Sequence, residues 1–522
     1  MSSIQLTIIA FALALYGNRA GTAELPLSGE QPKLIEIANR VDRHAEHAVL
    51  EKLVGFGTRH TASDTHSATR GIGAARRWIQ SRFTEIARDC DGCITIDTPS
   101  SIVTGERLSQ PTEIVDVLGI QRGTTDPDRV IVISAHLDSR VTDVMNVTAD
   151  APGANDDGSG VAAVMEAARI LSRYKFAATI VYAVLSGEEQ GLYGGVLLAQ
   201  TAKTNGWRVE AQLNNDIIGN IHGQSGVIDN THVRVFSEGS KATETPQEAT
   251  RRRYNGGELD TPSRNLSRYV ASLAQQYLTN FEVRMVYRTD RFNRGGDQVP
   301  MLEAGYPAIR VTEAVENYTR QHQDVRTENG IAYGDVIEGV DLSYLAQVTR
   351  LNVIALASLA WAPAPPMGVK IEGAVTADTK VSWSAVSGAA GYRIWWRDTT
   401  APQWSNSRWV ESSTTNITLT SINIDDMFFG VSAVSPEAFP SPIVFPGAAG
   451  SFEPPTIMQS KGGQVRWNIV FRSFDAYSEY CRGCQRERAC ENKFTELCVA
   501  LHVSIGNALR LQHSGHCAIL SG

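Results

Sequence analysis

The sequence lacks two features that would point to particular functions. It has no excess of positive charge, because 48 Lys and Arg residues face 56 Asp and Glu residues for a formal net charge of -8. Nucleic acid is therefore not a predicted partner. The sequence also lacks a long apolar run near its start, where the stretch from Ile4 to Leu15 is too short to cross a bilayer as a helix. We predict no transmembrane span.

The short apolar stretch near the start instead resembles a secretion signal. Small residues at Gly21-Thr22-Ala23 follow it as a cleavage site, although Met1-Ser2-Ser3 lacks the usual Lys or Arg. A buried N-terminal helix is the alternative, and the polar residues Asn18 and Arg19 disfavour it. We predict that residues 1–23 are a signal peptide and that the protein is secreted, either to the extracellular space or to a periplasm.

Cysteine is scarce before residue 453, where only Cys90 and Cys93 occur. Their spacing predicts a tight disulfide in an exported protein. A thioredoxin-like redox role is disfavoured because the pair follows a helical segment instead of opening one. The other five cysteines lie in the tail, residues 453–522, at Cys481, Cys484, Cys490, Cys498 and Cys517. We interpret this tail as a disordered or aberrant extension, with disulfides or a structural zinc site as alternatives.

With 522 residues, the chain is too long for one ordinary domain. The proline-rich linker Ala362-Pro363-Ala364-Pro365-Pro366 separates two patterns. Residues 24–362 alternate strands with helices, which predicts an α/β fold with a three-layer α/β/α, mostly parallel sheet. Residues 363–452 show short alternating strands and turns, which predict an all-β sandwich resembling a fibronectin type III module. Such a module serves as a spacer or as a contact surface for a polymer or a cell.

Several further segments have recognisable periodicity. Residues 32–46, 74–87, 265–280 and 340–361 are predicted helices, and residues 283–287 and 307–311 are predicted strands. His60 lies between the first two helices, and we interpret it as a structural residue.

Three predicted buried strands end in polar clusters. The apolar run at residues 129–135 stops at His136-Leu137-Asp138, the run at 179–185 stops before Glu188-Glu189, and the run at 209–213 ends in Asn214-Asn215-Asp216. The C-terminal ends of parallel strands are where open α/β sheets place ligand sites. A loop rich in glycine, residues 152–160, holds Asp156 at the mouth of the same sheet.

The residue types in these clusters predict a site for two divalent metal ions. A pair of zinc-like ions needs a carboxylate that bridges them, with imidazole or carboxylate on the outer side of each. A carboxylate that is not a ligand must then take a proton from the attacking water and pass it to the leaving amine, and Glu188 is the candidate. Asp138 is predicted to turn back and accept the other N–H of His136, with turn capping as its alternative.

Four ordered segments carry a family resemblance. They are residues 134–138, 152–160, 186–191 and 215–219, and in that order they resemble the co-catalytic zinc metallopeptidases of family twenty-eight. That family includes secreted bacterial leucyl aminopeptidases and the glutamate carboxypeptidase group. The resemblance implies the zinc-exopeptidase fold and two Zn²⁺ ions.

The resemblance also implies a role for each ligand. Asp156 would bridge the ions, and Glu188 matches the general base. His322 enters only through the resemblance, because residues 316–324 look like the family's final ligand motif. The outer pairs would be His136 with Asp216 and Glu189 with His322. The Asp156–Asp157 bond matches the place where relatives carry a cis peptide.

The chain departs from the family pattern at two positions. Gln298 stands where many relatives carry a histidine, and Gln321 stands where some carry a tyrosine that stabilises the developing oxyanion. Tyr318, Arg294 or the metals alone are the candidates for that second role. Substrate preference stays open, because it depends on which charge of the substrate the pocket receives. Arg291, Arg294 and Glu313 can each be argued to favour a positive or a negative group.

Taken together, these patterns predict a secreted di-zinc exopeptidase that acts on peptide or protein substrates. The activity that these patterns favour is that of an aminopeptidase, in which a metal-bridging hydroxide attacks the peptide bond and Glu188 serves as general base. The alternatives are a carboxypeptidase or dipeptidase on the same fold, a glutaminyl cyclase with a single zinc, and a non-catalytic binding or adhesion protein. The presence of Glu188 disfavours the last, since a scaffold kept for binding has no need of that acid.

Overall fold

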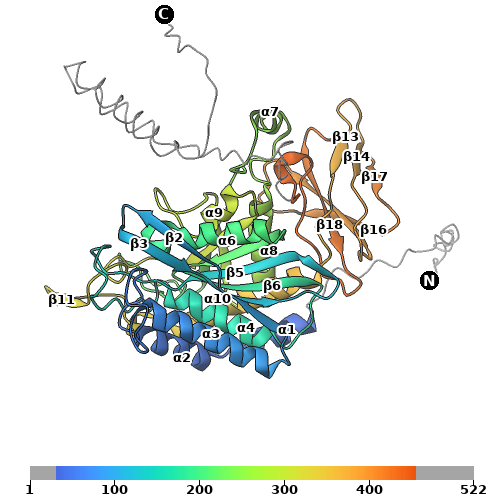
Figure 1. Cartoon of the computed structure of the whole chain (residues 1–522). Coiled ribbons are helices and arrows are strands. Elements are labelled where there is room, and N and C mark those ends of the chain that lie inside the picture. Colours follow the sequence, from blue (N-terminus) through green and yellow to red (C-terminus); the bar gives the residue numbers. More distant parts are fainter. Residues whose placement is uncertain (1–30, 454–522) are drawn as a thin grey trace, which may run out of the picture. The chain divides into compact units, whose positions relative to one another are not determined.

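The computed structural model describes residues 31–453 (Figure 1). The predicted signal peptide and the cysteine-containing tail lie outside the described residues. The described part is built around an eight-stranded sheet with the order β1-β4-β6-β5-β7-β10-β8-β9. In sequence order, these strands are β1 (Ile94–Asp97), β4 (Val117–Gln121), β5 (Asp126–His136), β6 (Ala178–Leu185), β7 (Arg208–Asn215), β8 (His232–Phe236), β9 (Glu282–Val286) and β10 (Ala308–Glu313).

The centre of this sheet is parallel. β5 runs parallel to both β6 and β7, and β7 runs parallel to β10. Antiparallel pairings occur toward the edges, where β1 joins β4, β4 joins β6 and β8 joins β10. The prediction of a mixed α/β fold with a large, mostly parallel sheet is confirmed. Because β5, β6, β7 and β10 all run the same way, the residues that follow them gather at one edge.

Both faces of the sheet are covered, which explains why the central strands are apolar throughout. Ile131, Ile133 and Ala135 of β5 enter one core, while Val130 and Val132 enter the other. The first core contains side chains of α1 (Pro32–Asn39), α2 (Arg43–Val54), α3 (Gly71–Asp89), α4 (Gly158–Leu171), α8 (Pro262–Tyr277) and α10 (Leu342–Trp361). The second contains side chains of α6 (Tyr193–Thr204) and α9 (Gln298–Glu303).

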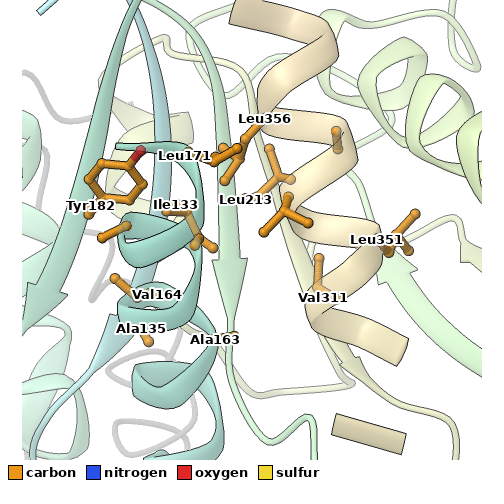
Figure 2. Close-up of a cluster of buried hydrophobic side chains, with 14 of the residues drawn as sticks. Ile133, Ala135, Ala163, Val164, Leu171, Tyr182, Leu213, Val311, Leu351 and Leu356 are labelled. Atoms are coloured by element: carbon orange, nitrogen blue, oxygen red, sulfur yellow. The ribbon is translucent and has the colours of Figure 1, made fainter. Parts of the chain in front are cut away.

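Helices α4 and α10 form the centre of the larger core. Figure 2 shows Val164 and Leu171 of α4 and Leu356 of α10 gathered around Ile133 and Leu213 of the sheet. By length and composition α10 is the one helix of the described residues that could cross a membrane, but 78% of its apolar window is buried inside the protein. That degree of burial is typical of the core helix of a folded domain.

The predicted helix at residues 32–46 is wrong in its length, because two helices occupy that region. α1 ends at Asn39 and α2 begins at Arg43. Asp42 causes the break: its side chain caps α2 by accepting from the backbone N–H of His44, and its own N–H donates to Glu166. The predicted disulfide between Cys90 and Cys93 is present at the end of α3, with a Cα–Cα distance of 5.5 Å.

Two small antiparallel sheets follow the proline-rich linker. One has the order β13-β14-β17 and the other β16-β15-β18. Their buried side chains share one core, which includes Val381, Ile394, Leu419 and Phe429. The predicted strands are thus present; the fibronectin type III likeness and the predicted domain boundaries stay predictions. The bounds are β13 (Lys370–Glu372), β14 (Thr379–Ser382), β15 (Gly391–Asp398), β16 (Asn406–Glu411), β17 (Asn416–Leu419) and β18 (Met427–Val434).

The remaining elements are short or peripheral. The hairpin of β2 (Ser100–Gly105) and β3 (Leu108–Val115) lies close to α6, and α5 (Glu188–Gly191) follows β6. The others are α7 (Pro246–Asn255), the hairpin of β11 (Arg326–Glu328) and β12 (Ile331–Tyr333), and the 3-10 turns η1 (Ile337–Gly339) and η2 (Ala448–Gly450).

Candidate metal centre

The candidate metal ligands lie at or after the ends of four strands and just before one helix. His136 is the last residue of β5, Glu188 and Glu189 open α5 after β6, and Asp216 directly follows β7. Asp156 precedes α4 by two residues, and His322 lies in the loop after β10. The structure therefore brings together all six side chains that the sequence singled out for metal binding and proton transfer.

These side chains form two groups. The ligand atoms of His136, Glu188 and Asp216 lie within 4.8 Å of one another, as do those of Asp156, Glu189 and His322. Asp156 also reaches the first group. Its Oδ1 lies 3.2 Å from Nε2 of His136, and its Oδ2 lies 2.9 Å from Nε2 of His322. One carboxylate thus has an oxygen directed at each group, which is the arrangement that a bridging ligand requires.

Two buried polar atoms test whether a metal fits here. Nε2 of His136 and Oε1 of Glu189 make no regular hydrogen bond among the described residues, and each lies against another candidate ligand, Oδ1 of Asp156 at 3.2 Å and Nε2 of His322 at 3.1 Å. An imidazole nitrogen donates to a carboxylate only when it carries a proton, whereas without that proton it is free to bind a metal. Both atoms are of the imidazole and carboxylate types that ligate zinc. The donor set therefore fits a bound metal.

The electrostatics show an excess of carboxylate. Burial alone would raise the pKa of Asp156, but the imidazoles of His322 and His136 hold it well below its usual range. Burial opposes the charged form of His322, yet Glu189 and Asp156 raise its pKa to about 10. Burial also raises the pKa of Glu188 well above its usual range, against the lowering effect of His136 and with the help of Asp216. A bound cation would stabilise the charged form of these carboxylates.

Asp138 organises the loop that carries Glu188 and Glu189. Its carboxylate accepts the backbone N–H groups of Gly187 at 2.9 Å and of Glu189 at 3.1 Å. The predicted bond from Nδ1–H of His136 goes instead to the backbone carbonyl of Asp138 at 3.0 Å, because the carboxylate lies farther away at 3.7 Å. Either acceptor leaves Nε2 of His136 free to bind a metal.

The loop of Asp156 is fixed from two sides. Asp157 caps α4 by accepting from the backbone N–H of Gly160, and the Asp156–Asp157 peptide bond is cis, at the place that the family resemblance indicated. Asp335 accepts the backbone N–H groups of Asn155 at 2.9 Å and of Asp156 at 2.7 Å. The orientation of Asp156 is therefore set by its backbone.

Comparison with known proteins identifies the family of the chain. The profile described as "Peptidase family M28" matches residues 116–336. A probable zinc metalloprotease of Leptosphaeria maculans is 45% identical over 76% of this chain and 93% of its own length. Another, of Pyricularia oryzae, is 43% identical over 81% of this chain and 86% of its own. The chain belongs to peptidase family M28. Among solved structures it is similar to LapB of Legionella pneumophila, with a TM-score of 0.47 and 18% identity over 64% of this chain and 77% of that one.

In this M28 chain, the two departures from the family pattern have structural partners. Gln298 is buried, donates to a carboxylate oxygen of Asp290 at 2.5 Å and accepts from the amide of Asn214 at 3.3 Å. Gln321 accepts from Nη1 of Arg294 at 3.0 Å. His60, interpreted from the sequence as structural, is buried, with Nε2 2.8 Å from the carbonyl oxygen of Val144.

Sequence reasoning missed three residues around the metal centre. Arg310 lies 2.6 Å from Asp216, and Arg140 donates to Glu189 at 2.8 Å and lies 2.6 Å from Nδ1 of His322. Asp335 is the third. Arg310 had a detectable signal, since it is a charged residue inside the apolar strand β10, and such residues need a buried partner. Arg140 and Asp335 lie in loops and carried no such signal.

A cavity of 830 Å³ opens beside the metal centre. Asp156, Glu188, Glu189, Asp216 and His322 line it. Its size is within the range of ligand pockets of about 300–1,000 Å³. A substrate in this cavity would lie in contact with the candidate ligands and with Glu188.

Proposed function

We propose that this M28 zinc metallopeptidase is a secreted di-zinc exopeptidase of the aminopeptidase type. The observation that carries the proposal is the position of Asp156, whose two carboxylate oxygens are directed at two separate ligand groups. In this proposal, His136 and Asp216 hold one ion, and Glu189 and His322 hold the other. The 830 Å³ cavity beside both groups gives the substrate access.

Zinc bound at these residues would polarise the scissile carbonyl and lower the pKa of a bound water. Glu188 supplies the acid-base chemistry. Its backbone N–H lies 3.3 Å from a carboxylate oxygen of Asp138, which orients the loop, while its side chain lines the cavity. Burial raises the pKa of the Glu188 carboxyl, and its position on the cavity wall beside both ligand groups lets it accept a proton from the attacking water and return it to the leaving amine.

The aminopeptidase form of the proposal rests on the four ordered sequence segments and their resemblance to leucyl aminopeptidases. A carboxypeptidase is the second candidate, because Arg107, Arg291 and Arg294 also line the cavity and guanidinium groups bind carboxylates. The two forms differ in which end of the peptide the enzyme requires.

Two further parts of the proposal concern the rest of the chain. Secretion is supported by the apolar stretch and small residues before position 24, and by the disulfide between Cys90 and Cys93, a bond typical of oxidising compartments. The shared core of the two small sheets supports a β-sandwich module after the linker. We assign it the role of a spacer or contact surface.

The experiment is an assay of the purified, zinc-loaded chain on two substrate sets. Aminoacyl-nitroanilides have a free N-terminus, and N-acetylated dipeptides have only a free C-terminus. The proposal expects hydrolysis of the first set alone and loss of that activity when a chelator removes zinc. Cleavage of the acetylated peptides alone would make the protein a carboxypeptidase. Hydrolysis of neither set by the loaded protein would overturn the proposed function.

A further inference from the structure

Arginines are unusually frequent around the cavity beside the metal centre. Among the described residues that line it, the acids are the four that belong to the metal centre and the exposed Glu106. The arginines that line it are Arg107, Arg140, Arg291 and Arg294. Arg140 belongs to the metal centre, because it donates to Glu189 and contacts His322. Three arginines remain with no role in holding candidate ligand side chains.

Arg291 is a buried cation with an unused donor. Its side chain is 9% exposed, its Nε donates to Asp290 at 3.1 Å and its Nη2 donates to the carbonyl of Gly295 at 3.2 Å. Its Nη1 is buried and has no hydrogen-bond partner among residues 31–453, since Glu316 lies 3.6 Å away. An unpaired buried donor lowers the stability of the folded protein. A ligand that supplies a hydrogen-bond acceptor to this nitrogen would remove that cost and would bind more tightly for it.

Arg294 is held by one nitrogen only. Its Nη1 donates to Glu316 at 3.2 Å and to Gln321 at 3.0 Å, and its side chain is 33% exposed. The described residues provide no hydrogen bond to its Nε or Nη2. Gln321, where some relatives carry a tyrosine, therefore fixes the guanidinium of Arg294 while leaving donors for a ligand.

The charges around these two arginines do not balance. Glu316 is shared by Arg234 at 2.6 Å, Arg291 at 3.6 Å and Arg294 at 3.2 Å. Asp290 pairs with Arg291 and also lies 3.5 Å from Arg310. Arg310 pairs more closely with Asp216, at 2.6 Å, so two carboxylates face three guanidinium groups, those of Arg234, Arg291 and Arg294. The surplus positive charge lies at the wall of the cavity and favours an anionic group there.

We propose that Arg291 and Arg294 bind a carboxylate of the substrate, which makes them specificity-determining residues. The proposal rests on the proposed peptidase function and names its substrate class. The carboxylate is either the side chain of an N-terminal Asp or Glu or the C-terminal carboxylate of the peptide. Both sources present the same planar pair of oxygens, which matches the fork of guanidinium donors.

The test compares substrates that differ in charge but little in shape. Values of kcat/KM are measured for the nitroanilides of Glu, Gln, Leu and Lys with the zinc-loaded chain. The proposal expects Glu to exceed Gln by roughly 10- to 100-fold, since hydrogen bonds to charged groups contribute about 1.5–3 kcal/mol. Arg294→Gln should bring this ratio close to one, and Arg294→Lys should restore part of it.

Arg208→Gln is the matched control. Arg208 is a half-exposed arginine that pairs with Asp126, and it begins β7, whose other end leads to Asp216. Its variant should keep the preference for Glu over Gln. A second arm separates the sources of the carboxylate: N-acetylated dipeptides with a free C-terminus are compared with their C-terminal amides. Cleavage of only the free acids would assign the arginines to the C-terminal carboxylate.

Direct binding keeps this inference separate from the proposed function. Calorimetric titration of Glu188→Gln protein measures carboxylate recognition without turnover. The ligands are glutamine amide, which has no carboxylate, isoglutamine, which has only the side-chain carboxylate, and glutamine, which has only the α-carboxylate. Tighter binding of either carboxylate ligand than of glutamine amide, lost in Arg294→Gln, supports the carboxylate site even if no substrate is hydrolysed. Equal binding of all three, with equal rates on acidic and neutral substrates of both sets, would overturn the inference and leave the peptidase assignment untouched.

Discussion

Two buried acidic regions of this protein differ in what neutralises them. At the contact between α8 and the small sheets, Asp260 lies between two arginines, 2.9 Å from Arg268 and 2.8 Å from Arg397, and all three side chains are almost fully buried. Both carboxylate oxygens of Asp260 accept from these guanidinium groups. At the metal centre, one imidazole nitrogen of His322 lies 2.9 Å from Asp156 and 3.1 Å from Glu189, so two carboxylates share it. The difference separates a structural acid from the acids that we assign to metal binding.

The largest effect should come from Glu188, the acid of the metal centre to which we assign no ligand role. Glu188→Gln keeps the shape of the side chain and removes the proton acceptor, so kcat should fall by about 10²- to 10⁴-fold. Zinc content, measured by elemental analysis, should stay unchanged. Glu106→Gln is the control, since it removes an exposed carboxylate from the same cavity. An active Glu188→Gln enzyme would show that another group moves the proton.

The structural acid should affect stability instead of activity. Asp260→Ala leaves the guanidinium groups of Arg268 and Arg397 buried without their partner, which should lower the free energy of unfolding by about 3–5 kcal/mol. Urea denaturation measures this change. Glu372→Ala breaks an exposed pair with Lys380 and should cost about 0–1 kcal/mol. Equal effects of the two variants would contradict the comparison.

A third buried acid has neither an ion pair nor a metal site among the described residues. Burial raises the pKa of Glu46 on α2 from 4.5 to about 8. Because the folded-state pKa is raised, its contribution to stability is present below about pH 4.5 and is lost as pH rises through about 8. Glu46→Gln should therefore match the native chain at pH 4 and exceed its free energy of unfolding by a few kcal/mol at pH 9.

Urea denaturation across this pH range tests the prediction for Glu46. Glu51→Gln removes a charge from the exposed side of the same helix and serves as the control. A difference between Glu46→Gln and the native chain that stays constant from pH 4 to pH 9 would show that the pKa of Glu46 is not raised in the folded protein.

The smallest effect should come from a residue that supports the metal centre from behind. Asp335 accepts the backbone N–H groups of Asn155 and Asp156. Asp335→Asn replaces one of the two accepting oxygens by a donor, so the loop of Asp156 should loosen and zinc affinity should fall by about tenfold. Competition with a chelator measures this affinity. An unchanged affinity would mean that the capping of α4 by Asp157 is enough to hold the loop of Asp156.

The sequence predicted the metal centre better than its surroundings. His136 ends an apolar strand, Asp216 directly follows another, and Glu189 lies on the short helix after a third, so local pattern was enough to place them at one sheet edge. Arg140, Arg310 and Asp335 contact the same site from distant segments, and no local periodicity encodes such pairings. The break between α1 and α2 was missed for a related reason, because Asp42 is fixed partly by Glu166, which is far away in the sequence.

The count of zinc ions per chain tests the central claim most directly. If Asp156 joins two complete ligand groups, elemental analysis of the purified chain, dialysed against zinc-free buffer, should find two zinc ions per chain. One ion, or none, would contradict the assignment of Asp156 as a bridge.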